Sequence, residues 1–339
     1  MKIKRKILFR ADGDSVTGLG HLYRCIALIE MLKKNYECFF LTRKYSLLEV
    51  IPEDYNVNLI PENILHSEEP NWIYENYSSD DFIIIADGYQ FSSNYQKKIK
   101  DFSFDLVYID DLATEKMFAD IVINHSLNVN DFISAEYTKF ALGPKYALLR
   151  PKFINASKKS REIKQISEVL ICFGGSDVFD ITNTVLEGII EIEEINKIHI
   201  VLGAAYMHEK IYKTLKRKKE NIFIYKNIQE QEMLDLMYRC QLAIVPSSTI
   251  SYEVCSVKMI VLSGYCIDNQ KRMYEGLNFN KLIYSGGDFN KLNAIDIKQK
   301  VSEIINDSPL NYKELIKNQS KIFDGNQIER FNNLIKSIC

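Results

Sequence analysis

The feature that most constrains the fold of this chain is a regular alternation of short apolar runs with stretches of helical spacing. In the first half, the apolar runs expected to form strands cover residues 6–10, 38–42, 58–60, 82–86, 106–109 and 121–123. The stretches of helical spacing fall near residues 21–34, 45–51, 68–77 and 91–101. Strands that are apolar on both faces and separated by helices are typical of a mostly parallel sheet covered on both sides.

The alternation is interrupted at residues 149–164 and then resumes. The interrupting stretch is polar and basic and contains Pro151, as is typical of a linker between domains. After it, strands are expected at 168–173, 198–202, 222–225, 242–246 and 259–263. Helices are expected near 180–192, 207–218, 230–239, 249–257 and 270–280, and two or three more between residues 290 and 337.

These patterns predict an α/β protein with two Rossmann-like domains in tandem, covering residues 1–152 and 153–325. A C-terminal helix at 326–339 ends the chain and could cross back onto the first domain. In such domains ligands bind at the carboxyl ends of the parallel strands, so the active site is expected in a cleft between the two domains.

Composition excludes several classes of protein. The chain has 339 residues, enough for two domains, and its 43 Lys and Arg against 45 Asp and Glu give a formal net charge of −2. Proteins that bind nucleic acid through their charge are usually basic, so no nucleic-acid partner is expected. No apolar run approaches the roughly 18 residues that span a bilayer. The short apolar run near the N-terminus is interpreted as a strand rather than a signal peptide.

The seven cysteines are scattered without the spacing of metal ligands, and most of them lie in apolar runs. We interpret them as buried free thiols in a reducing compartment. The expectation is a cytoplasmic protein that does not insert stably into a membrane. It is expected to be a monomer or a weak homo-oligomer and to use no cofactor.

The turn Gly18-Leu-Gly20-His21 follows the first apolar run and leads into the first predicted helix. Its glycines allow a positive φ angle or a close approach of the backbone to a ligand. The field of a helix N-terminus disfavours an imidazolium, so His21 is expected to be neutral near pH 7 and able to act as a general base. The alternative is a histidine that only satisfies local backbone groups, and the two glycines favour the functional interpretation.

Arg24 lies one helical turn after His21, on the same face of the predicted helix. It could contact an anionic ligand or pair with Asp12 or Asp14. These two acids could in turn orient His21, bind sugar hydroxyls or cap the turn. The residues alone leave these alternatives open.

Acidic and aromatic residues follow two further predicted strands. Asp87 and Tyr89 come directly after one of them, and Asp110 and Asp111 come directly after the next. In a parallel sheet these positions converge on the same edge as the turn that carries His21. Each acid could equally be a helix cap, but a tyrosine at this edge is suited to contact a sugar ring or a phosphate.

In the second half, small and hydroxyl residues follow two strands. The backbone N–H groups of Gly174-Gly175-Ser176 are suited to holding phosphate oxygens. Ser248 and Thr249 follow a later strand at the start of a helix, and a diphosphate could sit on that helix N-terminus.

Glu253 lies one turn into that helix and could accept hydrogen bonds from both ribose hydroxyls. The alternative for this group is a capping motif followed by a solvated acid. Asn269 and Gln270 follow a further strand at the same expected edge. No Walker sequence, metal-binding Asp-x-Asp or cluster of His and Cys stands out, so no metal ion is implied.

In their order along the chain, these residues resemble the UDP-2,4-diacetamido-2,4,6-trideoxy-β-L-altropyranose hydrolases of pseudaminic acid biosynthesis and related spore-coat polysaccharide proteins. The matching segments span roughly residues 5–280 and are Arg10-Ala-Asp12, Gly18-x-Gly20-His21-x-x-Arg24, Asp87-Gly-Tyr89-x-Phe91, Ile109-Asp-Asp111, Asn124, Gly174-Gly-Ser-Asp177, Ser248-Thr249 with Glu253, and Asn269-Gln270. The resemblance implies a GT-B-like architecture, related to glycosyltransferases such as the one that makes lipid II. It also implies metal-independent hydrolysis of a UDP-sugar at the anomeric carbon, with release of UDP.

The resemblance also implies roles for single residues. His21 activates the attacking water, Tyr89 helps to position the water or the sugar, and Asp12 completes the expected catalytic set. The second domain is the UDP-binding domain, with the diphosphate held by Gly174, Gly175, Ser176, Ser248 and Thr249. The further residues expected to contact the substrate are Gly20, Arg24, Asp87, Asn124, Glu253 for the ribose, Asn269 and Gln270. UDP is a good leaving group, so a base for water and N–H groups for the phosphates would suffice.

Two alternatives remain beside the hydrolase. A GT-B glycosyltransferase would use the same UDP-sugar donor with an alcohol acceptor in place of water, and the fold cannot decide between them. A non-catalytic nucleotide-sugar-binding protein is the other, and the presence of His21 with its glycines counts against it. The chain departs from the family pattern at Pro246-Ser-Ser248, where relatives often carry a glycine-rich turn, and in its tail after residue 285.

Overall fold

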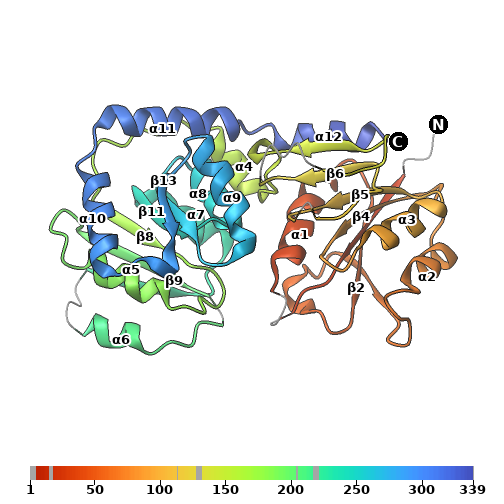
Figure 1. Ribbon diagram of the computed structural model, residues 1–339, viewed down its shortest axis with the longest axis horizontal. Coiled ribbons are helices and arrows are strands. Elements are labelled where there is room, and N and C mark those ends of the chain that lie inside the picture. The colour runs from red at the N-terminus through yellow and green to blue at the C-terminus, as the bar shows by residue number, and fades with distance from the viewer. Residues whose placement is uncertain are drawn as a thin grey trace. The chain divides into compact units, whose positions relative to one another are not determined.

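The computed structural model describes residues 5–14, 18–112, 114–126, 132–203, 205–216 and 221–338, and the chain divides into two compact units. Unit 1 consists of Met1–Pro151 together with Asn326–Cys339, and unit 2 consists of Lys152–Gly325. Each unit has its own sheet of parallel strands with helices packed on its faces (Figure 1).

The sheet of unit 1 has seven strands in the order β3-β2-β1-β4-β5-β6-β7, and every neighbouring pair is parallel. Its strands are β1 (Lys6–Ala11), β2 (Cys38–Arg43), β3 (Asn56–Ile60), β4 (Phe82–Asp87), β5 (Asp105–Ile109), β6 (Ile121–Asn124) and β7 (Lys139–Leu142). The first six lie at the predicted runs, because their β-branched and aromatic side chains suit a sheet buried on both faces. The sequence pattern does not predict β7, which is only four residues long.

Helices cover both faces of this sheet (Figure 1). They are α1 (Gly20–Leu32), α2 (Glu69–Asn76), α3 (Ser93–Asp101) and α12 (Gln327–Lys336), with the 3₁₀ turns η1 (Leu48–Val50) and η2 (Pro144–Tyr146). Leu8 of β1 packs in one core with Ile73 of α2 and Ile99 of α3. The C-terminal helix α12 packs against α1, where Nδ2 of Asn332 donates to the backbone oxygen of Met31 over 3.2 Å.

The sheet of unit 2 has six parallel strands in the order β10-β9-β8-β11-β12-β13. They are β8 (Glu168–Ile171), β9 (Lys197–Leu202), β10 (Ile222–Lys226), β11 (Leu242–Pro246), β12 (Ile260–Tyr265) and β13 (Tyr284–Asp288). The helical elements are α4 (Pro151–Ser157), α5 (Ile181–Ile189), α6 (Lys210–Leu215), α7 (Glu230–Arg239), α8 (Thr249–Ser256), α9 (Asp268–Phe279), η3 (Phe289–Lys291), α10 (Ala294–Ile305) and α11 (Pro309–Ile322). Its core combines apolar side chains of the sheet with those of α5, α10 and α11.

The boundary between the two units falls after Pro151, inside the stretch 149–164 that the sequence predicts as a linker. This stretch also carries α4, which begins at Pro151, a position where proline costs the helix no hydrogen bond. Two other local features differ from the expectations. The helix expected at 45–51 is reduced to the single turn η1. The sequence pattern misses β13, since the Gly286-Gly287 pair interrupts its apolar run.

The strand order creates a switch point in each sheet. In unit 1 the chain passes from β1 outward through β2 and β3 and then returns to the other side of β1 as β4. In unit 2 it passes from β8 through β9 and β10 and returns beside β8 as β11. Loops that leave the carboxyl ends of strands at such a point run in opposite directions and leave a crevice for a ligand. The predicted class, two Rossmann-like α/β domains, is therefore confirmed.

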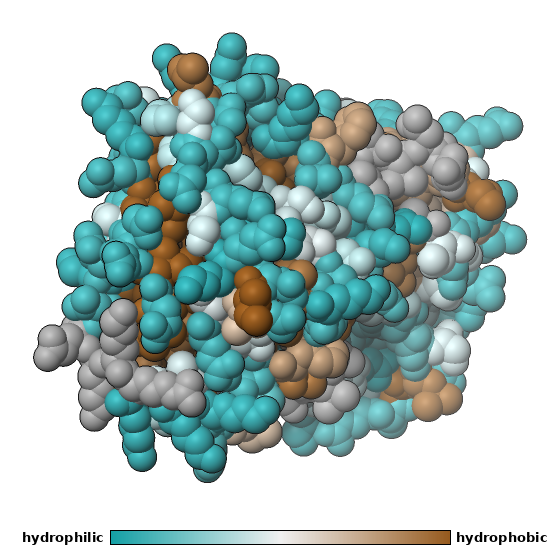
Figure 2. Space-filling model, turned by 60° about the vertical axis from the view of Figure 1, so that its left-hand side comes forward, coloured by the Kyte–Doolittle hydropathy of each residue, from teal (hydrophilic) through white to brown (hydrophobic). Residues whose placement is uncertain are grey.

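The face of the molecule in Figure 2 is largely hydrophilic. Its hydrophobic residues gather in small groups and in one elongated strip. Across the part of the chain that the structure describes, no helix combines the length and the apolar character needed to cross a membrane.

A network of buried charges ties β1 to α2. Arg10 of β1 is fully buried, and its Nε donates to Oε1 of Glu69 over 2.6 Å while its Nη1 donates to Oδ1 of Asp12 over 2.6 Å. Glu69 is also fully buried and accepts hydrogen bonds from Arg43 and Tyr95. Because water cannot screen or solvate these groups, each charge depends on its partners for compensation.

The substitution Glu69→Gln tests this dependence. It keeps the size of the side chain but leaves the buried Arg10 without one of its two counter-charges, so we expect the free energy of unfolding to fall by about 3–5 kcal/mol. Urea-induced unfolding measures the change. The control is Glu68→Gln at the exposed neighbouring position, where a change within about 0.5 kcal/mol is expected. Equal stability of the two variants would contradict the argument.

The same network predicts how stability depends on pH. Burial alone would raise the pKa of Glu69, but His66 and Arg10 outweigh it, so this pKa lies below its ordinary value of 4.5. A carboxylate whose pKa is lowered by folding stabilises the protein above its unfolded pKa and loses that contribution as pH falls through the lowered value. Unfolding curves between about pH 7 and pH 3 should therefore show a steeper loss of stability below about pH 4.5 in the wild type than in Glu69→Gln.

Candidate functional site

His21 lies at the start of α1, beside the carboxyl end of β1. The helix begins at Gly20, and Gly18 before it has φ = 86°, a conformation that favours glycine. The imidazole is 10% exposed, and its Nδ1 lies 2.7 Å from Oδ1 of Asp87. The ring of Tyr89 meets it edge-on, with the two ring centroids 4.8 Å apart. The candidate base is thus shielded from water and held at one ring nitrogen by a carboxylate.

Arg24 joins this pair to a second carboxylate. Its Nε and Nη2 donate to the two oxygens of Asp87 over 2.8 and 2.6 Å, and its Nη1 donates to both oxygens of Asp111 over 2.7 and 2.6 Å. Asp87 is fully buried and Arg24 is 7% exposed. Arg24 forms ion pairs, and its described partners are Asp87 and Asp111. Its contact with an anionic ligand stays a prediction.

The contacts of His21 indicate which ring nitrogen carries the proton when the ring is neutral. Oδ1 of Asp87 lies 2.7 Å and Nη2 of Arg24 lies 2.8 Å from Nδ1. The carboxylate can only accept and the guanidinium can only donate. An unprotonated Nδ1 would set its lone pair against the carboxylate oxygen at 2.7 Å, whereas Nη2 has Asp87 as an acceptor at 2.6 Å, so the consistent arrangement has Nδ1–H donating to Asp87. Nε2 is then the unprotonated nitrogen, which is the tautomer that a general base requires.

Parallel strands that end in register bring these residues together. Ala11 at the end of β1 pairs with Asp87 at the end of β4, and Asp87 pairs with Ile109 at the end of β5. The chain leaving β1 enters α1, which carries His21, and the chain leaving β5 carries Asp111. The cluster therefore lies at the switch point of the sheet, where ligands bind in this class of fold.

Asp12 has other described partners. Two nitrogens of Arg10 donate to it over 2.6 and 2.7 Å, and the Tyr45 hydroxyl and Nε2 of Gln90 donate to its Oδ2 over 3.1 and 3.2 Å. Burial would raise the pKa of Asp12, but Arg10 outweighs it and lowers the pKa. Among the described contacts, none joins Asp12 to His21, and its part in catalysis stays a prediction.

Asn124 and His125 follow β6 at the same edge. Nδ2 of Asn124 donates to Oδ2 of Asp110 over 3.1 Å, and its Oδ1 accepts from the backbone N–H of Ser126 over 3.0 Å. Nε2 of the buried His125 lies 3.9 Å from Oδ1 of Asp111. Burial lowers the pKa of His125 to about 4, so this ring is neutral at neutral pH and adds no charge to the site.

In unit 2, the loop after β8 lies at the switch point, and the space beside its glycine backbone is open. Gly174 has φ = 83°, and a Cβ at Gly174 or Gly175 would meet no heavy atom of the described chain within 4 Å. Gly203 packs against the loop so closely that a Cβ there would lie 2.3 Å from the backbone oxygen of Gly175. Ser176 is exposed. A loop supported on one side and open on the other suits the approach of phosphate oxygens to N–H groups.

The loop after β11 ends at the N-terminus of α8. Ser248 occupies the N-cap without a capping hydrogen bond from its side chain, and Thr249 is the first helical residue. Glu253 is 4% exposed, so only a small part of it faces water. Asn269 is exposed in the first turn of α9, and Oε1 of Gln270 accepts from a backbone N–H over 2.9 Å. That these residues hold a nucleotide stays a prediction.

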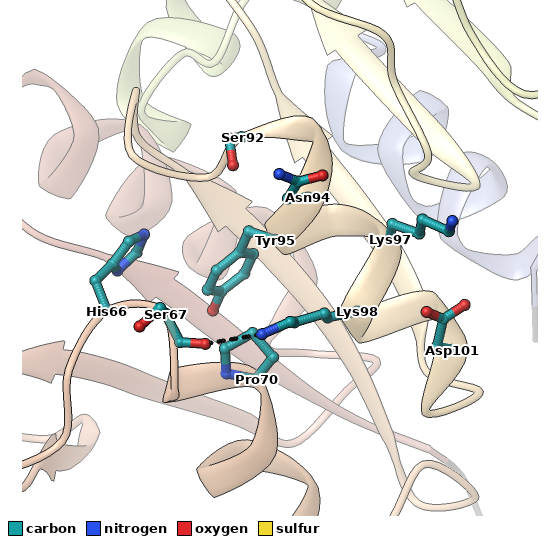
Figure 3. Close-up of a pocket in the computed structure, with 9 residues that line it drawn as sticks. All are labelled: His66, Ser67, Pro70, Ser92, Asn94, Tyr95, Lys97, Lys98 and Asp101. Carbon is teal, nitrogen blue, oxygen red and sulfur yellow. Dashed lines mark hydrogen bonds between the residues drawn. The ribbon is translucent and has the colours of Figure 1, made fainter.

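A cavity of about 510 Å³ lies elsewhere in unit 1, along α2 and α3 (Figure 3). It is lined by His66, Ser67, Pro70, Ser92, Asn94, Tyr95, Lys97, Lys98 and Asp101, none of which is a predicted site residue. Nζ of Lys98 donates across it to the backbone oxygen of Ser67 over 3.1 Å. Among the residues that the structure describes, no group of three or more His, Cys, Asp or Glu side chains is arranged to hold a metal ion.

No family model matches this chain. Among curated proteins, the spore coat polysaccharide biosynthesis protein SpsG of Bacillus subtilis is 28% identical over 265 residues, which cover 75% of this chain and 76% of SpsG. The UDP-2,4-diacetamido-2,4,6-trideoxy-β-L-altropyranose hydrolase of Campylobacter jejuni is 26% identical over 277 residues, 78% of this chain and 93% of that protein. The uncharacterized protein MJ1062 of Methanocaldococcus jannaschii is 28% identical over 286 residues, 80% of this chain but only 57% of that relative's length. The resemblance drawn from the sequence is supported at the level of a related family.

Solved structures share the fold. MurG of Acinetobacter baumannii superposes with a TM-score of 0.68 at 10% identity, covering 98% of this chain and 99% of that chain. A glycosyltransferase of Rickettsia africae gives a TM-score of 0.65 at 12% identity, covering 98% of each chain. HepE of Anabaena in complex with UDP gives a TM-score of 0.63 at 13% identity, covering 98% of this chain and 100% of that chain. At these identities the likeness shows the two-domain Rossmann-like fold alone.

Sequence reasoning missed several residues that support the site. Tyr45, Glu69 and Gln90 surround the Arg10–Asp12 pair, yet they lie in polar stretches where the pattern carries no signal of burial or pairing. Gly203 had a detectable signal, because a glycine directly after a buried strand is typical of a close approach between backbones.

The substitution Gly203→Ala tests the close packing of Gly203 against the loop that follows β8. The three heavy atoms nearest to the added Cβ would be backbone atoms of Gly174 and Gly175, at 2.3 to 2.5 Å, so the loop must shift. We expect the free energy of unfolding, measured in urea, to fall by about 1–3 kcal/mol. The matched control is Gly175→Ala, whose Cβ would enter open space and should leave stability nearly unchanged. A Gly203→Ala variant as stable as this control would show that the loops are not in contact.

Proposed function

We propose that this protein is a nucleotide-sugar hydrolase that cleaves the anomeric C–O bond of a UDP-2,4-diacetamido-trideoxy-hexose and releases UDP and the free sugar. The observation that carries the proposal is the cluster of His21, Asp87 and Arg24, in which a shielded imidazole is oriented with Nε2 as its unprotonated nitrogen. The Campylobacter jejuni relative, whose name is that of a hydrolase of such a UDP-sugar, supports the assignment, and pseudaminic (nonulosonic) acid biosynthesis for a surface polysaccharide is the proposed pathway.

In the proposed reaction, Nε2 of His21 takes a proton from a water molecule while the water oxygen attacks the anomeric carbon. The bond from that carbon to the diphosphate oxygen breaks, and UDP leaves with the bonding electrons. As the ring becomes an imidazolium, its Nδ1–H bond to Asp87 strengthens and stabilises the developing charge. Tyr89, about half exposed and edge-on to the ring, is assigned to positioning the water or the sugar.

The proposal assigns the nucleotide to the loops after β8 and β11 of unit 2. Backbone N–H groups around Gly174 and Gly175, together with the N-terminus of α8 at Ser248 and Thr249, would neutralise the charge that grows on the leaving diphosphate. Glu253 is assigned to the ribose. Because the chain itself supplies these N–H donors, the proposed reaction proceeds without a metal ion.

A second candidate is a glycosyltransferase that uses the same donor. The fold, which the Rickettsia africae glycosyltransferase shares, does not distinguish the two reactions, and the His21 base would deprotonate an alcohol acceptor as readily as water. The two candidates differ in one requirement. A transferase releases UDP at a useful rate only when its acceptor is present.

The deciding experiment incubates the protein with the UDP-sugar in ¹⁸O-labelled water, without an acceptor and with EDTA. We expect release of UDP, with the label in the promptly analysed free sugar and none in UDP. Label in UDP would move the attack to phosphorus. Absence of UDP release without an acceptor would overturn the hydrolase proposal in favour of the transferase, and dependence on added Mg²⁺ would overturn the metal-independent mechanism.

Variants locate the reaction at His21. His21→Asn removes the base and should lower kcat by about 10²–10⁴-fold. Asp87→Asn should also lower kcat, because the ring loses the carboxylate that orients it. The control is His199→Asn, which alters a histidine of β9 in unit 2 that contacts Glu168 and Tyr225 and lies outside the proposed machinery. A His21→Asn variant as active as this control would rule out the assigned base.

A further inference from the structure

Asp111 contacts the guanidinium of Arg24 through both of its carboxylate oxygens. The same guanidinium also holds Asp87, the acid that contacts His21. Both oxygens of Asp111 accept from Nη1 of Arg24, over 2.7 and 2.6 Å, and its side chain is 12% exposed. Burial would raise the pKa of Asp111, but the charge of Arg24 outweighs it, so this pKa is lowered and the group is a carboxylate. Opposing carboxylates likewise raise the pKa of Arg24 against the effect of burial, so the guanidinium stays charged.

The formal charges of the cluster have a consequence for His21. With a neutral imidazole, two carboxylates and one guanidinium leave one negative charge overall in a site shielded from water. With an imidazolium, the four groups balance. If Asp111 were absent, Arg24 alone would cancel Asp87, and a proton on His21 would create an uncompensated positive charge.

We propose that Asp111 is a positioning residue for the His21 base, which acts through Arg24 to fix Asp87 against the imidazole and supplies the negative charge that lets the ring take up a proton. The consequence of Asp111 for catalysis rests on the proposed function. The effect of Asp111 on the protonation of His21 does not rest on that function, because it follows from the buried cluster alone.

The other titratable groups around the cluster are Cys25 of α1, Arg10 of β1, Tyr108 of β5, and Tyr89, Asp110 and His125 in the segments that follow β4, β5 and β6. Asp110 accepts from Asn124 and from the backbone N–H of Leu112, and the control variant below measures its effect on the balance. Burial raises the pKa values of Cys25 and Tyr108 and lowers that of His125, so these three are neutral at neutral pH. Arg10 is already paired with its own two carboxylates.

The test follows the titration of the His21 ring by NMR in the free, full-length protein with labelled histidine. The chain has five histidines, and His21→Gln identifies the resonance. Asp111→Asn should lower the midpoint of the titration by about one pH unit. The matched control is Asp110→Asn, at the adjacent carboxylate that accepts from Asn124 and from the backbone N–H of Leu112, and it should leave the midpoint in place.

A second variant is expected to shift the midpoint of the His21 titration in the opposite direction. Arg24→Gln leaves two carboxylates facing His21 and should raise the midpoint, and it serves as the measurement if Asp111→Asn does not fold. A purely structural role of Asp111 predicts lower thermal stability with an unmoved midpoint. That result, or shifts of the same sign in both variants, would overturn the proposal.

Activity measurements separate this proposal from the proposed function. If the protein hydrolyses a UDP-sugar, the acid limb of the kcat profile should move to lower pH in Asp111→Asn, together with the NMR midpoint. If no variant and no wild-type sample hydrolyses the substrate, the proposed function fails while the shift in the His21 titration still supports the role of Asp111. If hydrolysis is observed and the midpoint stays fixed, only the role of Asp111 fails.

Discussion

A guanidinium removed from water needs carboxylates beside it, and in unit 1 this constraint acts at Arg24. The side chain is 7% exposed, and Asp87 and Asp111 reach it from the ends of two different strands. Removing either acid would leave the buried guanidinium with one carboxylate in place of two and some of its N–H groups without their acceptors, and an unsatisfied buried polar group is costly. The fit of α1 against the ends of β4 and β5 depends on these bonds. The place of His21, one turn earlier on the same helix, depends on them as well.

The same topology occurs in both units, but its switch points carry different chemistry. In unit 1 the switch point holds shielded, ionisable side chains, and a site of low polarity strengthens their mutual effects. In unit 2 the switch point holds glycines in open space and a helix N-terminus without a side-chain cap. Exposed N–H groups suit a phosphate, which must reach them from water. Proton transfer and anion binding place opposite demands on burial, and the proposed function assigns the first to unit 1 and the second to unit 2.

The buried network of Arg10, Asp12 and Glu69 supports the loop that follows β1. It joins β1 to the start of α2 through charges that water cannot screen. It also occupies Asp12, one of the two acids before the first helix that could have oriented His21. With Asp12 held by Arg10, the acid that meets the imidazole comes from β4 instead.

The sequence by itself determined most of the order of strands and helices, though not β7 or β13. It also determined the class of fold and the place of His21 at the first strand-to-helix turn, because periodicity and glycines are local signals. It could not determine which acid meets His21, since Asp87 lies 66 residues away. The parallel pairing of β1 with β4 decided this by setting Asp87 opposite Ala11. The sequence likewise carried no signal that Glu69 is buried against Arg10. Contacts between distant segments arise only when the sheet and its helices assemble, so tertiary structure alone decided them.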